Sequence, residues 1–177
     1  WLQEDSDWGV YGQLFISDGS IRGPEFQVNT YTDSDQRSPS VSYLSDGGFV
    51  VCWGDGGEIG GQLFNSNGSK RGIKFQVNTY TNIDQKNAAV AMRADGSFVV
   101  VWSSYRQDGS SNGIFGQRFD PNCDPVDEEF QINATTAGNQ TEPAVAVNAD
   151  GDLVVAWQGP GLTGDDEEDI FAQRFDP

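Results

Sequence analysis

Short apolar segments separated by glycine-containing turns dominate the pattern along this chain. The segment Asp-Gly-Gly-Phe-Val-Val-Cys-Trp at residues 46–53 returns as Asp-Gly-Ser-Phe-Val-Val-Val-Trp at 95–102 and as Asp-Gly-Asp-Leu-Val-Val-Ala-Trp at 150–157. A segment of alternating character precedes each copy, at residues 40–44, 89–92 and 144–147. An Asp-Gly pair between two strands favours a tight hairpin turn, because that turn needs positive φ angles. The pattern therefore predicts a repeated hairpin whose second, almost wholly apolar strand is buried on both faces.

Two further segments recur in the same order and complete the repeat. Gly-Gln-Leu-Phe at 12–15 has copies at 61–64, 116–119 and 172–175, and Phe-Gln-Val-Asn at 26–29 has copies at 75–78 and 130–133. No segment has a helical period with caps. We predict an all-β fold of tandem four-stranded antiparallel blades of the propeller type, with a repeat of roughly fifty residues. A β-trefoil, which also has three units of four strands, is the alternative; the fourth copy of the Gln-x-Phe segment argues against it.

The repeat divides the chain into units that its ends interrupt. We place repeat 1, with the end of a preceding unit, at residues 1–58, repeat 2 at 59–113 and repeat 3 at 114–169, and we expect residues 170–177 to be the first strand of a following unit. Because Trp1 aligns with Trp53 and Pro177 aligns with Pro121, both ends fall within a unit. We therefore expect either a longer array or chain ends that pair with a neighbour.

Charge and composition narrow the range of partners. The formal net charge is −17 and the chain contains no His. Such a chain repels nucleic acid and anionic membrane surfaces, and it lacks the commonest general base and transition-metal ligand. No apolar run is long enough to span a membrane. We therefore expect no nucleic-acid partner and no membrane insertion.

The two cysteines do not form a disulfide framework. Cys52 lies in an apolar strand segment and Cys123 in a polar turn. We expect a buried, unreactive thiol at Cys52. The sequence leaves open whether the two residues are bonded to each other.

Several of these motifs in order resemble a known kind of repeat. Phe-Gln-Val-Asn-Thr-Tyr-Thr, then Asp-Gly-x-Phe-Val-Val-x-Trp and then Gly-Ile-Phe-Gly-Gln-Arg-Phe-Asp are similar to tandem repeats of very large secreted surface proteins of bacteria and some protists. The resemblance covers nearly the whole chain. It implies a propeller-like surface or matrix protein with an extracellular or cell-surface location, and it supplies no catalytic residues. The calcium-binding nonapeptide that often accompanies such proteins is absent.

The loop after each Trp carries most of the carboxylates. Calcium binds six to eight oxygen ligands, several of them carboxylate, so these loops are candidate metal sites, and calcium is the one cofactor that we consider. The alternative is a solvated acidic loop that keeps the protein soluble. The candidate ligands are Asp5, Asp7, Asp55, Glu58, Asp108, Asp165, Asp166 and Asp169.

Other recurrent residues favour structural roles. We expect Gln13, Gln62, Gln117 and Gln173 to satisfy backbone groups between strands, and Trp53, Trp102 and Trp157 to pack in the core. Three Asn-x-Ser/Thr sequons, at Asn67, Asn133 and Asn139, are candidate glycosylation sites in a secreted glycoprotein.

Two classes of function follow from this organisation. Hydrolysis of a glycoside needs a pair of carboxyls about 5–10 Å apart. The sequence singles out no such pair and its acids recur loosely in every unit, so we predict that the chain is not an enzyme. We expect a structural repeat protein that forms or decorates a surface fibre, sheath or matrix by self-association of strand edges. The alternative is an adhesin or carbohydrate-binding propeller module that uses its acidic loops to bind glycans, with or without calcium.

Overall fold

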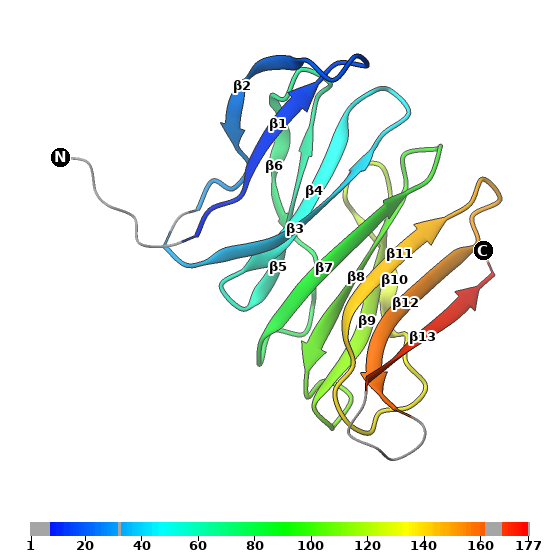
Figure 1. Ribbon diagram of the computed structural model, residues 1–177. Helices are drawn as coiled ribbons and strands as arrows, with labels where there is room; N and C mark the ends of the chain where they lie inside the picture. The colour runs from blue at the N-terminus through cyan, green and yellow to red at the C-terminus, as the bar shows by residue number, and fades with distance from the viewer. Residues whose placement is uncertain (1–7, 32, 162–167, 177) are drawn as a thin grey trace.

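Thirteen β-strands make up the described part of this computed structural model, which comprises residues 8–31, 33–161 and 168–176 (Figure 1). They form four antiparallel sheets that follow one another along the chain. The first sheet has two strands, β1 (Tyr11–Phe15) and β2 (Ile21–Gln27). The second has four: β3 (Gln36–Tyr43), β4 (Phe49–Asp55), β5 (Glu58–Phe64) and β6 (Lys70–Gln76). Among the described residues there is no helix of the length and apolarity that a membrane span needs.

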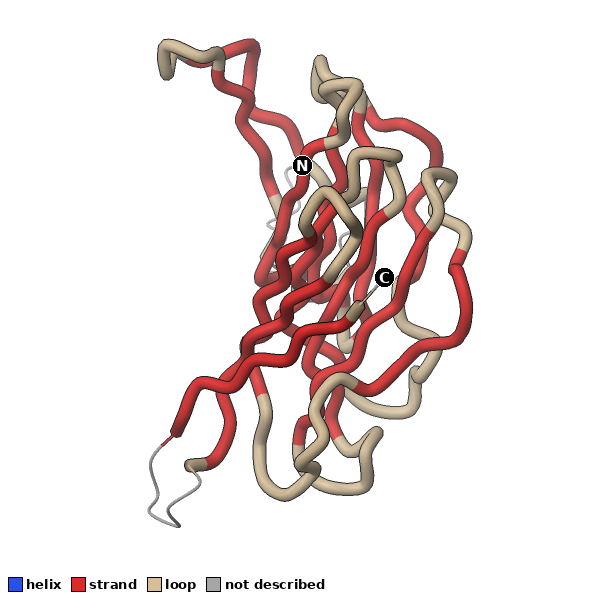
Figure 2. Tube along the Cα trace, turned by 90° about the vertical axis from the view of Figure 1, so that its right-hand side faces the viewer, coloured by secondary structure: helices blue, strands red, loops and turns tan. Residues whose placement is uncertain are grey.

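The remaining two sheets repeat this order. The third consists of β7 (Gln85–Met92), β8 (Phe98–Tyr105), β9 (Asn112–Phe119) and β10 (Pro125–Gln131). The fourth has three described strands: β11 (Thr141–Val147), β12 (Leu153–Pro160) and β13 (Glu168–Phe175). Within each sheet, strands that follow one another in sequence pair with each other, so each sheet is a simple meander (Figure 2).

The Asp-Gly pairs form the predicted hairpin turns. In the first of them Gly47 has a φ of 82°, its amide donates to the Leu44 carbonyl, and the Leu44 amide donates to the Gly48 carbonyl at 2.7 Å. Gly96 and Gly151 have φ angles of 88° and 94° at the equivalent positions. Glycine adopts this left-handed conformation without a steric penalty, which explains the repeated Asp-Gly.

The sheets pack face to face around three apolar cores, one at each junction between neighbouring sheets. Each junction is closed by the Phe of a Phe-Gln-Val-Asn motif, which packs on aromatic rings of the following sheet. Phe75 of the second sheet lies 6.0 Å from Phe98 and 5.6 Å from Phe119, ring centroid to centroid, and those two rings stack at 5.0 Å. Burial of such large rings at every junction is a major source of stability.

The inner edges of three sheets lie side by side. β3, β7 and β11 are each an edge strand of their sheet, and they follow one another across the molecule (Figure 1). Sheets that radiate from a row of such strands are propeller-type blades, so the predicted fold class is confirmed and the β-trefoil alternative is wrong. We call the end with the β4–β5 and β8–β9 connections and the entries to β3, β7 and β11 the loop end.

The predicted unit boundaries need correction, although the period is right. The boundaries after residues 58, 113 and 169 fall inside β5, β9 and β13. The sheets themselves span 36–76, 85–131 and, for the described strands, 141–175. Residues 170–177 do not begin a new unit, because β13 pairs with β12 as the third strand of the fourth sheet. Sequence periodicity fixes the repeat length but not its phase.

Candidate functional site

The inner strands share an irregularity near the loop end. The pairing of β3 with β4 shifts between Arg37 and Ser40, and the equivalent shift occurs in β7 between Lys86 and Ala89 and in β11 between Thr141 and Ala144. At each shift one residue other than glycine adopts a left-handed conformation. These residues are Ser38, Asn87 and Glu142, with φ angles of 51°, 56° and 53°. Such a conformation costs on the order of 1 kcal/mol or more and is concentrated at functional positions.

The three bulges together line one open hollow. It has a volume of about 350 Å³ and is lined by Ser38 with Pro39 and Ser40, by Asn87 with Ala88, and by Glu142 with Pro143. Ser38 and Glu142 are exposed and Asn87 is half-buried. A hydroxyl, an amide and a carboxylate from three consecutive blades therefore meet in one place, where they can accept and donate several hydrogen bonds.

Adjacent inner strands are joined beside this hollow. The Ser40 hydroxyl on β3 accepts a hydrogen bond from the Val90 amide on β7 at 3.2 Å. Ala88 and Pro143 are buried beneath the polar side chains. The hollow thus has an apolar floor and a polar rim.

A buried amide network anchors the start of each inner strand. In the second sheet Asn78 Oδ1 accepts from the Ile59 amide at 2.7 Å, and Asn78 Nδ2 donates to the Tyr80 carbonyl at 2.9 Å and to Gln85 Oε1 at 3.1 Å. Asn29 with Gln36 and Asn133 with Gln140 make the same contacts in their own units. All six side chains are buried. Because Gln36, Gln85 and Gln140 each lie two residues before Ser38, Asn87 and Glu142, this network holds the strained residues in place.

Carboxylates at the loop end accept hydrogen bonds from the amides of this network. Asp55 pairs with Lys74 and accepts from Gln36 Nε2 at 3.3 Å; Glu58 accepts from Asn78 Nδ2, and Asp108 Oδ2 accepts from Asn133 Nδ2 at 3.4 Å. No group of three His, Cys, Asp or Glu side chains among the described residues is arranged to hold a metal. Asp169 lies on β13. Asp5, Asp7, Asp165 and Asp166 lie outside the described residues, so their candidacy as calcium ligands stays a prediction.

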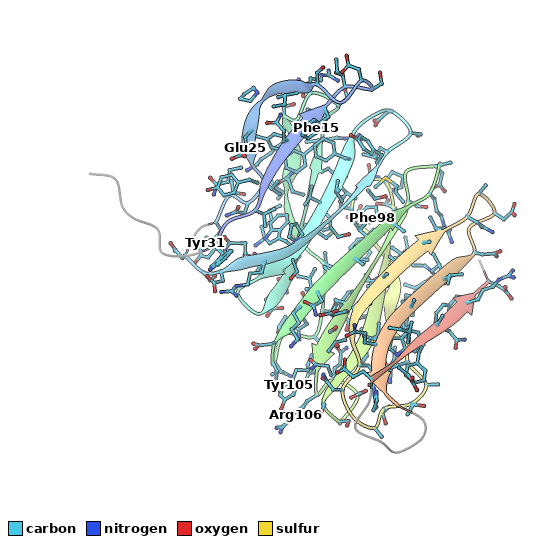
Figure 3. The ribbon with its side chains drawn as sticks, in the orientation of Figure 1. Phe15, Glu25, Tyr31, Phe98, Tyr105 and Arg106 are labelled. Carbon is cyan, nitrogen blue, oxygen red and sulfur yellow. The ribbon has the colours of Figure 1, made fainter. Side chains whose placement is uncertain are left out.

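Aromatic side chains accompany the carboxylates at this end. Tyr31 is 54% exposed, and its pKa is raised because its hydroxyl donates to the Asp33 carboxylate, whose negative charge adds to the effect. Figure 3 shows Tyr31 at the entry to β3, and Tyr105 and Arg106 together at the end of β8. The Arg106 guanidinium lies 5.1 Å from the centroid of the Tyr105 ring.

The recurrent glutamines bind the backbone of the outer strands. Gln62 is 1% exposed, and its Nε2 donates to the carbonyls of Leu63, Arg71 and Gly72 at 3.0, 3.1 and 3.4 Å. Gln117 and Gln13 make the corresponding contacts across β9–β10 and β1–β2, whereas Gln173 is exposed and contacts the Arg174 carbonyl at 3.5 Å. Trp53, Trp102 and Trp157 are buried in the cores.

The three sequons lie in different environments. Asn67 is exposed in the β5–β6 turn, and Asn139 is exposed in the β10–β11 connection. Asn133 is 3% exposed and both ends of its amide belong to the network described above. A glycan on Asn133 is incompatible with this packing, so that part of the prediction needs correction.

Both cysteines are free thiols in this structure. Burial raises the pKa of Cys52 far above its usual value, and burial together with the Asp120 charge raises the pKa of Cys123 to about 11. Neither thiol ionises at neutral pH, so neither is activated as a nucleophile.

The residues that line the hollow were not found by sequence reasoning. Ser38, Asn87 and Glu142 differ in type, so no motif marks them, and a left-handed residue inside a strand has no signature without glycine. One available signal was the Asn and Gln pair spaced by seven residues in each unit, at 29 and 36, 78 and 85, and 133 and 140. That spacing marks the entry to each inner strand.

Comparisons with known proteins bear on the fold. No protein-family model matches the sequence, and no curated protein matches it. Among solved structures, an endo-arabinase from Bacteroides thetaiotaomicron is similar at 14% identity and a TM-score of 0.52, over 84% of this chain and 61% of that one. The Hadza microbial sialidase Hz136 is similar at 13% identity and a TM-score of 0.58, over 79% of this chain and 35% of that one. The GH43 protein BlXynB from Bacillus licheniformis is similar at 12% identity and a TM-score of 0.51, over 92% of this chain and 36% of that one. This chain spans less than two thirds of each of them.

These similarities correct one prediction and leave another unsupported. The prediction that the chain is not an enzyme is contradicted, because glycoside hydrolases share this fold, so repetition of blades is compatible with glycoside hydrolysis. At such identities the likeness shows the fold alone and assigns no reaction to this chain. The tandem strand repeat is real, but no match links it to the secreted surface-protein repeats that it resembles.

Proposed function

We propose that this chain is a carbohydrate-binding propeller module that takes a neutral glycan into the hollow between β3, β7 and β11. The observation that carries the proposal is the convergence of Ser38, Asn87 and Glu142, each in a left-handed conformation, at one hollow of about 350 Å³. Maintaining three strained residues at equivalent positions is costly, and the supporting Asn and Gln network restricts their movement.

The chemistry of the hollow suits a polyhydroxylated ligand. A carboxylate accepts hydrogen bonds from sugar hydroxyls, while the Asn87 amide and the Ser38 hydroxyl both donate and accept. The net charge of −17 repels anionic glycans, which favours neutral sugars. Structures of similar fold include an arabinase, a sialidase and an arabinanase with bound arabinobiose, which favours the carbohydrate-binding hypothesis over a surface fibre.

The test begins with a screen of the 177-residue chain on a glycan array, followed by calorimetric titration of the best neutral glycan. Asn87→Gly and Ser38→Gly delete a side chain where the backbone already suits glycine, so the fold is retained. Each of these variants, and Glu142→Gln, should weaken binding by about tenfold, equivalent to about 1.4 kcal/mol.

Matched controls make the result specific. Asp127→Gly makes the same kind of change at another left-handed residue, φ 63°, on the outer strand β10, and Glu25→Gln removes a charge from exposed Glu25 on β2 (Figure 3). Both should leave glycan affinity unchanged. Equal affinity in the hollow variants and the wild type would overturn the proposal. Sugar released from a bound oligosaccharide would show that the site also hydrolyses it.

An extracellular location belongs to the same proposal. Asn67 and Asn139 are exposed sequons that a secretory pathway of the eukaryotic type would modify. Mass spectrometry of peptides from the native protein should then find glycans on these two residues and none on Asn133. Unmodified peptides throughout would remove this support.

A further inference from the structure

The open face of β3 and the free edge of β1 form an apolar groove. The groove has a volume of about 270 Å³, and its lining includes Val10, Leu14, Phe26, Val41, Tyr43 and Phe49. β1 pairs with β2 on one side, and its other edge has no strand partner in the described part of the chain. An unpaired edge beside exposed apolar side chains is a surface suited to strand addition.

Equivalent positions in the repeat identify what this groove lacks. Val41 is 61% exposed, whereas Val90, its counterpart on β7, is 7% exposed because the second sheet covers it. Phe15 on β1 is 58% exposed, whereas its counterparts Phe64 and Phe119 are 0% and 1% exposed (Figure 3). The side chains are therefore apolar in all units, and only the neighbouring strands differ.

The two complete sheets show which strands cover these positions. Phe64 on β5 stacks on Phe49 of the adjacent β4 at 4.9 Å, and Phe119 on β9 stacks on Phe98 of the adjacent β8 at 5.0 Å. In both cases the covering strand is the second strand of a hairpin and begins with Phe-Val-Val. A strand beside β1 would need the same Phe to cover Phe15.

We propose that this groove binds a two-stranded β-hairpin of the same repeat pattern. Its second strand pairs antiparallel with β1 and places a Phe on Phe15, and its first strand covers Val41 and Tyr43. A second folded copy of the chain does not offer such a hairpin, since β4, β8 and β12 each have strands on both edges. The occupant is therefore a hairpin whose second strand still has a free edge.

A peptide taken from this chain tests the proposal. Residues 87–104 span β7 to β8 and carry one positive and one negative side chain, Arg93 and Asp95. A fluorescent version with solubilising lysines at both ends should bind the 177-residue chain saturably by anisotropy, at physiological salt. A Val100→Pro peptide should lose at least tenfold in affinity, because proline removes a ladder donor and disrupts strand pairing. Equal binding of the two peptides, or the lack of saturable binding, would overturn the proposal.

Variants of the protein locate the contact. Val41→Asp puts a charge in the groove at an exposed position, so it should preserve the fold and weaken peptide binding at least tenfold. Val126→Asp on β10, where Val126 is 41% exposed, is the matched control and should bind normally. Unchanged binding by Val41→Asp would refute the site. A dimer in sedimentation that Val41→Asp abolishes would instead assign the face to a second copy.

Discussion

The junction between the second and third sheets and the junction around β1 are built from the same sequence pattern but differ in burial. At the former, Val90, Phe98 and Phe119 are buried in one core. At the latter, Val41 and Phe15 are largely exposed, although they occupy positions equivalent to Val90 and Phe119. The difference shows that in this fold a repeat unit does not complete its own core; the inner strands of one sheet cover the next.

The strongest test of this comparison places the same charge at equivalent positions. Val90→Asp should reduce the free energy of unfolding by about 3 kcal/mol or more, because a carboxylate would be buried without a partner. Val41→Asp should change it by less than about 0.5 kcal/mol, because this position is exposed. Urea unfolding followed by tryptophan fluorescence measures both. Similar losses in the two variants would mean that the β3 face is covered in solution.

Removing the recurrent glutamine should lower the free energy of unfolding by different amounts in the two regions, because Gln62 on β5 is buried and Gln13 on β1 is half-buried. Gln62→Ala leaves three backbone carbonyls without their side-chain donor in a buried setting, and should cost about 1–3 kcal/mol. Gln13→Ala should cost less than half as much, since Gln13 is only half-buried and contacts two carbonyls. The same denaturation assay compares them. A larger loss of unfolding free energy for Gln13→Ala than for Gln62→Ala would contradict a stabilising role for these hydrogen bonds to the backbone.

One outer strand departs from its counterparts in a way that predicts stabilisation. Gly23 and Gly72 have φ angles of 74° and 72° at the outer-strand bulge, where β10 has Asp127 with a φ of 63°. Asp127→Gly should therefore raise the free energy of unfolding by up to about 1 kcal/mol. Glu128→Gly, at a neighbouring position without a positive φ, should lower it instead. Destabilisation by Asp127→Gly would show that the carboxylate has a compensating contact.

The smallest expected effect concerns acid pH. The Asp95 pKa is lowered, chiefly because the carboxylate accepts from the Ser97 hydroxyl and also from its amide. Since this pKa is lower in the folded than in the unfolded chain, its stabilising contribution is complete above the unfolded value of about 3.9 and is lost as pH falls through the folded value. Ser97→Gly, which reproduces Gly48 of the first turn, should move the Asp95 pKa upward in an NMR titration. An unchanged pKa would show that the hydroxyl does not contribute.

Much of the fold could be predicted because strand periodicity and turn chemistry are local. The Asp-Gly hairpins, the buried Phe-Val-Val strands and the Trp core positions are set by alternation and by the need for positive φ. The phase of the sheets was predicted wrongly, because the repeat period alone does not show which strand begins a sheet and the Asn and Gln pair that marks this point was not used. The contacts of the glutamines with the backbone could be predicted, because each glutamine points to the same face of its strand as an apolar neighbour and a buried amide needs hydrogen-bond partners.

The candidate site was less accessible from sequence, for physical reasons. Ser38, Asn87 and Glu142 share a backbone conformation and a location, not a side-chain type, and only the lateral packing of β3, β7 and β11 brings them together. The sequence instead pointed to the acidic loops, because carboxylates are the side chains that calcium prefers. In the structure Asp55, Glu58 and Asp108 accept hydrogen bonds from amide groups of the network that supports the inner strands, and calcium binding by these residues stays a prediction.

Mapping of glycan contacts on backbone amides by NMR is the most direct test of the proposed carbohydrate site. On addition of the best neutral glycan from the array, the account predicts saturable shifts at residues 37–40, 86–88 and 141–144, with none at 10–15 in the groove. Asn87→Gly should lose these shifts at the same ligand concentration. Shifts confined to other surfaces, or no shifts with any neutral glycan, would contradict the account.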